Sequence, residues 1–275
     1  MSFYTSLNGL KNAQTDLGVI SHNIANAETT GFKKSRTEFA DIVVGSAFTN
    51  PKLVVGIGAA VESISQNFAL GPIEQTGSAL DLAINGDGFF TTKNVVTQET
   101  LYTRNGSLTV DGGGFIGDGS NNRLQVFPTD AAGVITSQTP VDAQIPSSNG
   151  IDANGNPIEF AGITVGDDGA VTASYADGSN LIIGKVALAS FIAPQGLKQI
   201  GSSNWIASGL SGAATYGQPS TGQYGSLLSG ALERSNVDIA EELVGLITAQ
   251  RNFQANAKAI DTATQISQTV IQLRT

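Results

Sequence analysis

The residue types that most often carry catalysis are scarce in this chain. Among its 275 residues there is no cysteine and a single histidine, His22. Thiol nucleophiles, zinc sites with sulfur ligands and sites that need a histidine pair are therefore excluded. His22 lies inside a predicted helix, where we expect a solvated or hydrogen-bonded structural role.

Two glycine-containing segments partly match nucleotide-binding loops. Gly86-Asp87-Gly88 begins like a dinucleotide fingerprint, but Thr91 stands in place of the third glycine and Phe89-Phe90 opens a strand. Phosphate binding by such a loop needs the amides and the dipole of a helix start. Gly184-Lys185 is followed by Val186 instead of Ser or Thr, within a predicted strand. We therefore predict no cofactor and no cofactor-binding residues.

The carboxylates also have structural explanations. Asp167-Asp168 fits a turn, and Glu241-Glu242 fits the negative first turn of a helix, which the helix dipole favours. Asp111, Asp118 and Asp130 lack the spacing of a calcium loop. The hydrolase pattern Gly-x-Ser-x-Gly does not occur. We predict no catalytic residues, no metal ligands and no enzymatic activity.

Charge is distributed unevenly along the chain. The formal net charge is −9, and residues 61–230 carry 14 acidic and 5 basic side chains, whereas the two ends are balanced. Because a nucleic-acid groove needs positive charge, no nucleic-acid partner is expected. The longest apolar stretch, Leu181 to Ala193, is short and contains Lys185, so we predict no membrane insertion. The N-terminus lacks the basic-then-apolar order of a secretory signal, so no cleaved signal peptide is predicted.

The N-terminal segment has the apolar spacing of a long helix. Only Gly9, Gly18 and Gly245 of the 33 glycines fall within residues 1–30 and 236–275. Since glycine costs about 1 kcal/mol in a helix interior, these ends are free to be helical. Asn23 and Asn26 lie near the predicted helix end, which Gly31 is expected to stop in the left-handed conformation. The stripe consists of Phe3, Leu7, Leu10, Ala13, Leu17, Ile20, Ile24 and Ala27.

The C-terminal segment predicts a second, longer helix. Asp238 with Glu241 three residues later resembles a capping box, and no proline follows Pro219. A helix is therefore predicted over about residues 238–273, roughly 54 Å long. Its seam consists of Ile239, Leu243, Leu246, Gln250, Phe253, Ala257, Ile260, Thr264 and Ile271.

These helices could simply cover a globular core. Their seams, however, mix Leu and Ile with Ala, Gln and Thr, which favours close helix–helix contact. We predict that the two helices pair as a coiled-coil-like stalk, whose remaining apolar surface needs neighbours. Identical chains are the simplest neighbours, and a contact between them that does not close into a ring builds a helical filament.

The middle of the chain alternates short apolar runs with turn signals, which predicts antiparallel strands in a barrel or sandwich. The predicted fold class is α+β, with terminal helices at 1–30 and 236–275, an extended linker or contact segment at 31–70 and a β-rich domain at 71–235. Residues 146–157 are predicted to be a loop or an excursion between two β segments. The predicted turns are Asn85 to Gly88, Asp111 to Gly114, Asp167 to Gly169 and Ala176 to Gly178.

Four blocks of sequence resemble the bacterial flagellar rod and hook proteins, and the resemblance covers nearly the whole chain. The first block is SHNIANAETTGFK at 21–33, and the second is LAINGDGFF at 82–90. The third is YTRNGS at 102–107, and the fourth runs from GALERSNVD at 230–238 through AQRNFQANAK at 249–258. The resemblance implies that the terminal helices line a tubular polymer and that the β domain faces outward.

Within this family the sequence favours a hook subunit, with a distal rod subunit as the alternative. The tail at 249–258 looks most like hook proteins, whereas Glu241 to Val244 also resembles the distal rod protein. Larger hook proteins carry an outer domain near residues 146–162, which this chain lacks. Distal rod proteins carry a longer insertion where only Ser46 to Val55 stands here. The expected function is a curved tubular universal joint that transmits torque.

The resemblance also implies partners and a location. Expected partners are identical subunits, distal rod and hook–filament junction proteins, the hook cap and the flagellar type III export apparatus. The expected location is the flagellar hook and basal body, outside the cell. The self-assembly residues are predicted to be Phe3, Leu7, Leu10, Leu17, Ile20, Asn23, Ile24, Asn26, Gly31, Phe32, Ile239, Leu243, Leu246, Gln250, Phe253, Ala257, Ile260 and Ile271.

Two other classes of function remain as alternatives. A cell-wall hydrolase would need a carboxylate or nucleophile cluster within 70–230, where the sequence offers none. A surface adhesin would need an exposed aromatic patch, and Tyr175, Trp205 and Tyr216 form no obvious cluster in the sequence.

Overall fold

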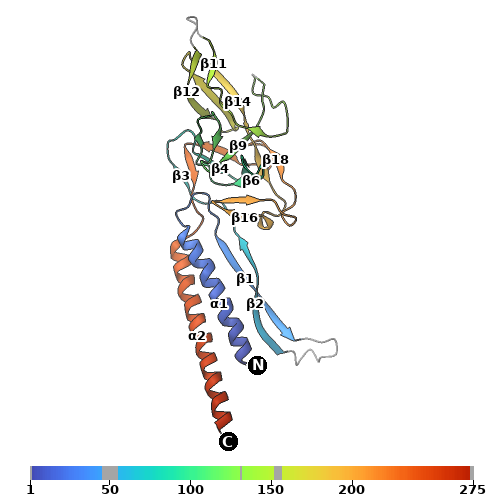
Figure 1. The fold of residues 1–275 in the computed structure, drawn as a ribbon, viewed down its shortest axis with the longest axis vertical. Helices are drawn as coiled ribbons and strands as arrows, with labels where there is room; N and C mark the ends of the chain where they lie inside the picture. Colours follow the sequence, from blue (N-terminus) through green and yellow to red (C-terminus); the bar gives the residue numbers. More distant parts are fainter. Residues whose placement is uncertain (1, 45–54, 131, 152–156, 273–275) are drawn as a thin grey trace. The chain divides into compact units, whose positions relative to one another are not determined.

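The computed structural model describes residues 2–44, 55–130, 132–151 and 157–272 and has an α+β fold (Figure 1). The chain forms two compact units. The helical unit comprises Met1–Ala27, Lys34–Asn67 and Val237–Thr275, and the β unit comprises Glu28–Lys33 and Phe68–Asn236. The predicted fold class, two terminal helices with a central β region, is confirmed.

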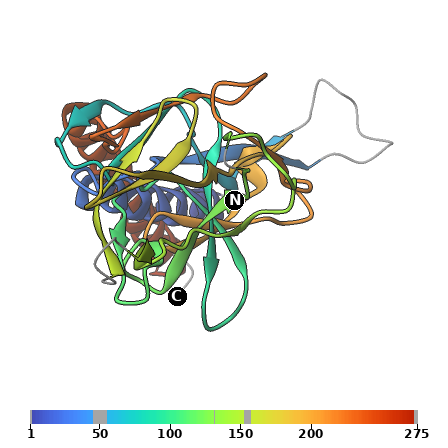
Figure 2. The ribbon, with the colours of Figure 1, turned by 90° about the horizontal axis from the view of Figure 1, so that it is seen from above.

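The helical unit is built around two paired helices, α1 (Ser2–Ala25) and α2 (Ile239–Gln272). They lie side by side in both views (Figure 1 and Figure 2). A Cβ atom added to Gly9 would lie 2.6 Å from Asn256 Oδ1, and one added to Gly245 would lie 3.5 Å from Ile20 Cδ1. Because the early part of α1 meets the later part of α2, the pair is antiparallel.

The start of α2 follows the predicted capping. Asp238 Oδ1 accepts hydrogen bonds from the backbone N–H groups of Ala240 at 2.8 Å and Glu241 at 3.2 Å. These bonds satisfy two donors that the first turn of a helix otherwise leaves unpaired.

The end of α1 differs from the prediction that Gly31 stops the helix. The helix ends at Ala25, where the side-chain amide of Asn26 donates to the His22 carbonyl at 2.9 Å. Gly31 does adopt the left-handed conformation, with φ +67°, but it lies in the β unit. The helix-stop role was wrong because Asn26 closes the last turn first.

A β-hairpin packs against α1 within the helical unit. Its strands are β1 (Ser35–Val44) and β2 (Val55–Gln66), paired antiparallel. Asn12 Nδ2 donates to the Ala59 carbonyl at 2.8 Å, which ties α1 to β2. The segment between the strands belongs to the predicted linker or contact segment at 31–70, and its residues 45–54 lie outside the described part of the chain.

The β unit is a network of short strands, and every pairing in its described part is antiparallel. Its largest sheet runs in the order β11-β12-β13-β14-β9-β5-β6-β17-β16. The strands are β3 Ile73–Gln75, β4 Leu82–Asn85, β5 Phe89–Asn94, β6 Thr100–Thr103, β7 Thr109–Val110, β8 Ile116–Gly117, β9 Asn122–Phe127, β10 Val141–Asp142, β11 Ser148–Ile151, β12 Pro157–Val165, β13 Ala170–Tyr175, β14 Asn180–Val186, β15 Leu188–Ser190, β16 Lys198–Gly201, β17 Asn204–Ile206, β18 Thr215–Gly217, β19 Ser226–Ser229 and β20 Ala231–Glu233.

Three of the four predicted hairpin turns are confirmed. The turns at Asp111 to Gly114, Asp167 to Gly169 and Ala176 to Gly178 join β7 to β8, β12 to β13 and β13 to β14. The turn at Asn85 to Gly88 was wrongly predicted as a hairpin, because β4 pairs with β19 and β5 with β6, β9 and β15. The bend instead brings Gly86 against Gly225, whose N–H donates to the Asp87 carbonyl at 2.9 Å.

The predicted loop at 146–157 is also corrected. Residues 148–151 form β11, which pairs with β12, Ser148 standing opposite Glu159. Residues 152–156 lie outside the described part of the chain. The glycine, asparagine and proline residues of this segment predicted a loop. A strand as short as β11 nevertheless fits among them and adds to the edge of the sheet.

The described part of the β unit has two separate buried cores. The larger core is mostly aliphatic and includes Leu82, Ile84, Phe90, Leu124 and Val126. The smaller one, which we call the aromatic cluster, contains Phe89, Tyr102, Ala189, Leu197 and Trp205, with Phe68, Phe191 and Ala214 packed against it. Edge-to-face contacts join its rings, as expected for buried aromatic side chains.

Candidate functional site

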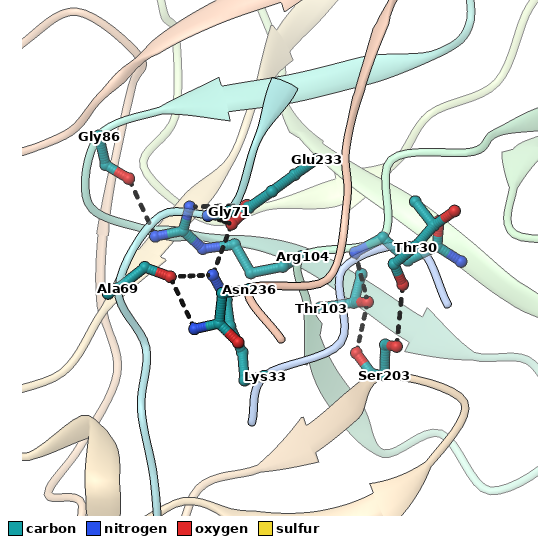
Figure 3. A network of polar contacts seen from close by, with 11 residues as sticks. Thr30, Lys33, Ala69, Gly71, Gly86, Thr103, Arg104, Ser203, Glu233 and Asn236 are labelled. Atoms are coloured by element: carbon teal, nitrogen blue, oxygen red, sulfur yellow. Dashed lines mark hydrogen bonds and ion pairs between the residues drawn. The ribbon is translucent and has the colours of Figure 1, made fainter. Parts of the chain in front are cut away.

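A fully buried ion cluster lies in the β unit beside the aromatic cluster. Lys33 Nζ lies 2.5 Å from Glu233 Oε1, and Arg104 Nη1 lies 3.2 Å from Glu233 Oε2 (Figure 3). The side chains of Lys33 and Glu233 are wholly buried, and that of Arg104 is nearly so. We call Lys33, Arg104 and Glu233 the junction cluster.

Backbone groups complete the junction cluster (Figure 3). Lys33 Nζ donates to the Ala69 carbonyl at 2.7 Å, and Glu233 Oε1 accepts from the Gly71 N–H at 2.9 Å. Arg104 Nη2 donates to the Gly86 carbonyl at 2.9 Å. Buried charges persist when they are paired and hydrogen-bonded in this way, because each ion otherwise loses its hydration without replacement.

The electrostatics of the cluster are asymmetric, with two cations around one carboxylate. Burial lowers the pKa of the Lys33 ammonium, and the Glu233 carboxylate opposes that shift. Burial likewise lowers the pKa of Arg104, against the attraction of Glu233 and Asp87. The Arg104 guanidinium also lies 5.3 Å from the centre of the Phe89 ring, a favourable cation–π distance. Glu233 is thus the countercharge that both cations share.

The backbone of residues 28–33 is held tightly next to this cluster. The Gly31 N–H donates to the Glu233 carbonyl at 2.8 Å, and Ser203 Oγ donates to the Thr30 carbonyl at 3.0 Å. A Cβ atom on Gly31 would lie 2.5 Å from the Asn105 nitrogen, closer than real Cβ contacts occur. Only glycine therefore fits this position.

The four blocks that carry the family resemblance meet at the junction cluster. They contribute Lys33, the Gly86 carbonyl, Arg104 and Glu233 respectively. The chain passes between its two units next to residues 28, 33, 68 and 236. The Ala69 carbonyl also accepts a bond from Asn236 Nδ2 at 3.2 Å. Within the β unit, the cluster therefore holds Lys33 and the backbone at Ala69 and Gly71, close in sequence to two of these crossing points.

A second buried polar group lies within the helical unit, at Asn23. Its Nδ2 donates to the Ser35 carbonyl at 2.8 Å and to Glu242 Oε2 at 3.1 Å, and its Oδ1 accepts from the Ser35 N–H at 2.9 Å. Asn23 is buried and so joins α1, β1 and α2 of one chain. Lys34, 3.0 Å from Glu241 Oε2, supports the same corner.

The predicted self-assembly residues occupy three kinds of place. Ile20, Asn23, Gly31 and Phe32 are buried within single units. Leu7, Leu10, Leu17, Ile24, Asn26, Leu246, Phe253, Ala257 and Ile260 are half-buried. Phe3, Ile239, Leu243, Gln250 and Ile271 are exposed.

Several residues of these sites were not predicted from the sequence. Lys33, Arg104 and Glu233 lie inside the four blocks, but no role was predicted for them. A charged residue embedded in each apolar or glycine-rich block was the available signal. Val244 and Ile247, which lie exposed beside the predicted seam of α2, were not predicted either.

In the described part of the chain, no three His, Cys, Asp or Glu side chains are grouped so that they could hold a metal ion. No described helix is long and apolar enough to span a membrane.

Comparison with known families places the chain. Three family profiles match it in order: flagella basal body rod protein at residues 3–33, flagellar hook protein FlgE/F/G D1 domain at 83–173, and flagellar basal body rod FlgEFG protein C-terminal at 228–273.

Individual relatives match over the full length. The flagellar basal-body rod protein FlgG of Bacillus subtilis is 36% identical over 99% of this chain and 98% of its own length. The FlgG of Borreliella burgdorferi is 33% identical over 95% of this chain and 94% of its own length. The flagellar hook protein FlgE of Escherichia coli is 27% identical over all of both chains. The chain therefore belongs to the family of flagellar rod and hook proteins, whose names describe structural parts of the flagellum.

Proposed function

We propose that this chain is a self-assembling subunit of the flagellar hook, whose copies form a curved tube that transmits torque from rod to filament. The terminal helices form its inner layer and the β unit its outer layer. Its partners are identical subunits, distal rod and junction proteins, the hook cap and the type III export apparatus, which delivers the chain outside the cell.

The observation that carries self-assembly is an apolar face on α2 without a partner in the described chain. Ile239, Leu243 and Ile247 are spaced by four residues, so they lie along one face, and Val244 flanks them. Each of these four side chains is between 44% and 65% exposed. Burial of apolar surface contributes about 25 cal/mol per Å², so packing this face against another copy stabilises an assembly.

Bending of a hook demands that neighbouring helices slide. The hydroxyls of α2 support this, because they bond within their own helix. Those of Thr248, Thr262 and Thr264 donate to carbonyls four residues earlier at 2.9 Å. Ser267 and Thr269 do the same at 2.9 and 3.0 Å. A helix surface whose polar groups are already satisfied can shift against a neighbour without breaking intermolecular hydrogen bonds.

A specific observation also favours the second candidate, a distal rod subunit. The Bacillus subtilis FlgG alignment runs over 288 positions, close to the 275 residues of this chain, whereas the Escherichia coli FlgE alignment runs over 410. The hook proposal is supported by the resemblance of the tail at 249–258. It is also supported by the short connection between β1 and β2, which pair as far as Val44 and Val55.

Electron microscopy of assemblies grown from the purified chain distinguishes the two candidates. A hook subunit is expected to form curved tubes, because its contacts permit sliding. Straight tubes of the same diameter would contradict the hook proposal and support the rod.

Deletion of residues 46–55 tests the role of the connection between β1 and β2, and we expect it to change the curvature of the tubes. Deletion of residues 152–156, in the connection between β11 and β12, serves as the control.

A further inference from the structure

The β unit contains a hollow of about 470 Å³ that the proposed function does not use. One wall is the end of β9 with the connection that follows it, and the other is β18 with the segment after it. A hollow of this size can hold a small molecule. We call it the amide hollow, and the described residues that line it are Phe127, Ile135, Thr136, Ser137, Gln138, Tyr216, Gly217, Gln218 and Thr221.

The described residues that line the amide hollow include no charged side chain. Charged ligands are normally bound by groups of opposite charge, so this lining favours an uncharged ligand. Most of the lining side chains are nevertheless polar. Covering their hydroxyls and amides with a purely apolar ligand would cost free energy, because their hydrogen bonds to water would be lost without replacement. The lining therefore suits a ligand that offers hydrogen-bonding groups without charge.

The polar groups of the lining are hydroxyls and side-chain amides. Thr221 Oγ1 donates to the Gln218 carbonyl at 2.6 Å. Thr136 Oγ1 donates to the Pro128 carbonyl at 3.1 Å, and both hydroxyl oxygens keep the capacity to accept. Within the described part of the chain, the side-chain amides of Gln138 and Gln218 have no hydrogen-bond partner. An amide offers donors and an acceptor together, which suits ligand hydroxyls that donate and accept at once.

An aromatic ring with a fixed orientation stands beside these amides. Tyr216 is 38% exposed, and its Oη lies 3.0 Å from Oη of the buried Tyr102. This bond holds the tip of the ring and leaves part of the ring surface open. Because the face of an aromatic ring carries partial negative charge, it attracts the weakly positive C–H groups on one face of a sugar ring. A ring beside amides that can bind hydroxyls is therefore suited to a carbohydrate.

Hydrogen bonds hold both walls of the amide hollow in place. In the wall after β9, the Thr136 N–H donates to the Pro128 carbonyl at 2.9 Å. In the wall after β18, the Ser220 N–H donates to the Gly225 carbonyl at 3.1 Å. A site that is already formed loses little conformational entropy when a ligand binds, so these bonds favour binding.

A peptide is another uncharged ligand that such a lining could take. It would be held best by pairing with the backbone of β18, which in the described part of the chain pairs only with β15. Tyr224 covers that strand, because its Oη donates to the Thr215 carbonyl at 2.9 Å. The Tyr224 ring also lies against Gly217, where an added Cβ would be 2.1 Å from Cε2. Recognition in the amide hollow therefore relies on side chains, which favours a carbohydrate over a peptide.

We propose that the amide hollow binds an uncharged carbohydrate of one or two sugar rings. The ring of Tyr216 packs against one face of a sugar, and the amides of Gln138 and Gln218 bond to its hydroxyls. This binding site goes beyond the proposed function and does not require the chain to assemble, so either proposal can fail without the other.

Titration of the full chain, kept monomeric by dilution, with neutral disaccharides tests the proposal. The probes are cellobiose, maltose and N,N′-diacetylchitobiose, and two-dimensional NMR of the backbone amides follows binding. We expect at least one probe to shift the signals of the lining residues and to saturate with a dissociation constant of about 0.1–10 mM. Gln138→Leu and Gln218→Leu are each expected to weaken binding about three- to tenfold, as for the loss of one or two hydrogen bonds.

Gln144→Leu is the matched control, because it removes an exposed amide that does not line the hollow, and it is expected to change the affinity less than about twofold. The same spectra show that each variant is folded. Equal affinity of all three variants would overturn the proposal. So would the absence of shifts at about 50 mM of every disaccharide, or tighter binding of the uncharged peptide N-acetyl-triglycine amide at these residues.

Discussion

Replacing Glu233 with glutamine is expected to lower the unfolding temperature of the chain's β unit by about 6–20 °C. The substitution leaves Lys33 and Arg104 buried without their shared countercharge. Breaking a buried ion pair from one side costs about 3–5 kcal/mol, and each kcal/mol shifts the midpoint of such a unit by about 2–4 °C. Thermal unfolding followed by near-ultraviolet circular dichroism, which reports the packing of Trp205, measures the change.

The matched control for that experiment is Glu74→Gln. Glu74 Oε2 lies 2.6 Å from Arg234 Nε, but both side chains are well exposed, so the pair contributes at most about 1 kcal/mol. Adding Lys33→Met to Glu233→Gln removes one of the two uncompensated cations and is expected to recover part of the loss. Equal midpoints for Glu233→Gln and Glu74→Gln would show that the junction cluster does not stabilise the fold.

Replacing Gly31 with alanine is expected to cost about 2–5 kcal/mol of the free energy of unfolding. One part is the left-handed backbone at φ +67°, and the other is the clash of the new Cβ with the Asn105 nitrogen and the Arg104 carbonyl carbon. Both obstacles are backbone atoms, so neither can rotate away. Urea unfolding at equilibrium, analysed for its midpoint and slope, measures the loss.

Gly77→Ala separates the two contributions. Gly77 has φ +77° but nothing lies within 4 Å of its added Cβ, so only the conformational cost of about 1–2 kcal/mol is expected. If the two alanine variants lose equal stability, the close approach of residues 104 and 105 to Gly31 plays no part in the fold.

Local signals in the sequence predicted the elements of this fold well. The heptad spacing and the scarcity of glycine at the ends located α1 and α2, and Asp238 marked the start of α2 correctly. Asp-Gly turns located three hairpins because a turn with positive φ is set by its own residues. The prediction of a hairpin at Asn85 to Gly88 was wrong because β4 pairs with β19, which is far away in the sequence.

The junction cluster could not be predicted by such signals. Lys33 and Glu233 lie 200 residues apart, and no pattern of spacing connects them. The left-handed conformation of Gly31 was predicted correctly, because it is a property of that residue alone. Its place beside Asn105 depends on how the β unit folds, which local propensity does not encode. The antiparallel hairpin of β1 and β2 was missed for the same reason, because strand pairing is not local.

Sedimentation of the purified chain over a range of concentrations tests most directly whether it assembles through α2. Unmodified chain is expected to pellet above a critical concentration, as is Gln254→Ser, a change at an exposed polar position of α2. Leu243→Ser combined with Ile247→Ser removes half of the exposed apolar face and is expected to raise that concentration by at least about a hundredfold. A doubly substituted chain that is folded and pellets like the unmodified chain would contradict assembly through this face.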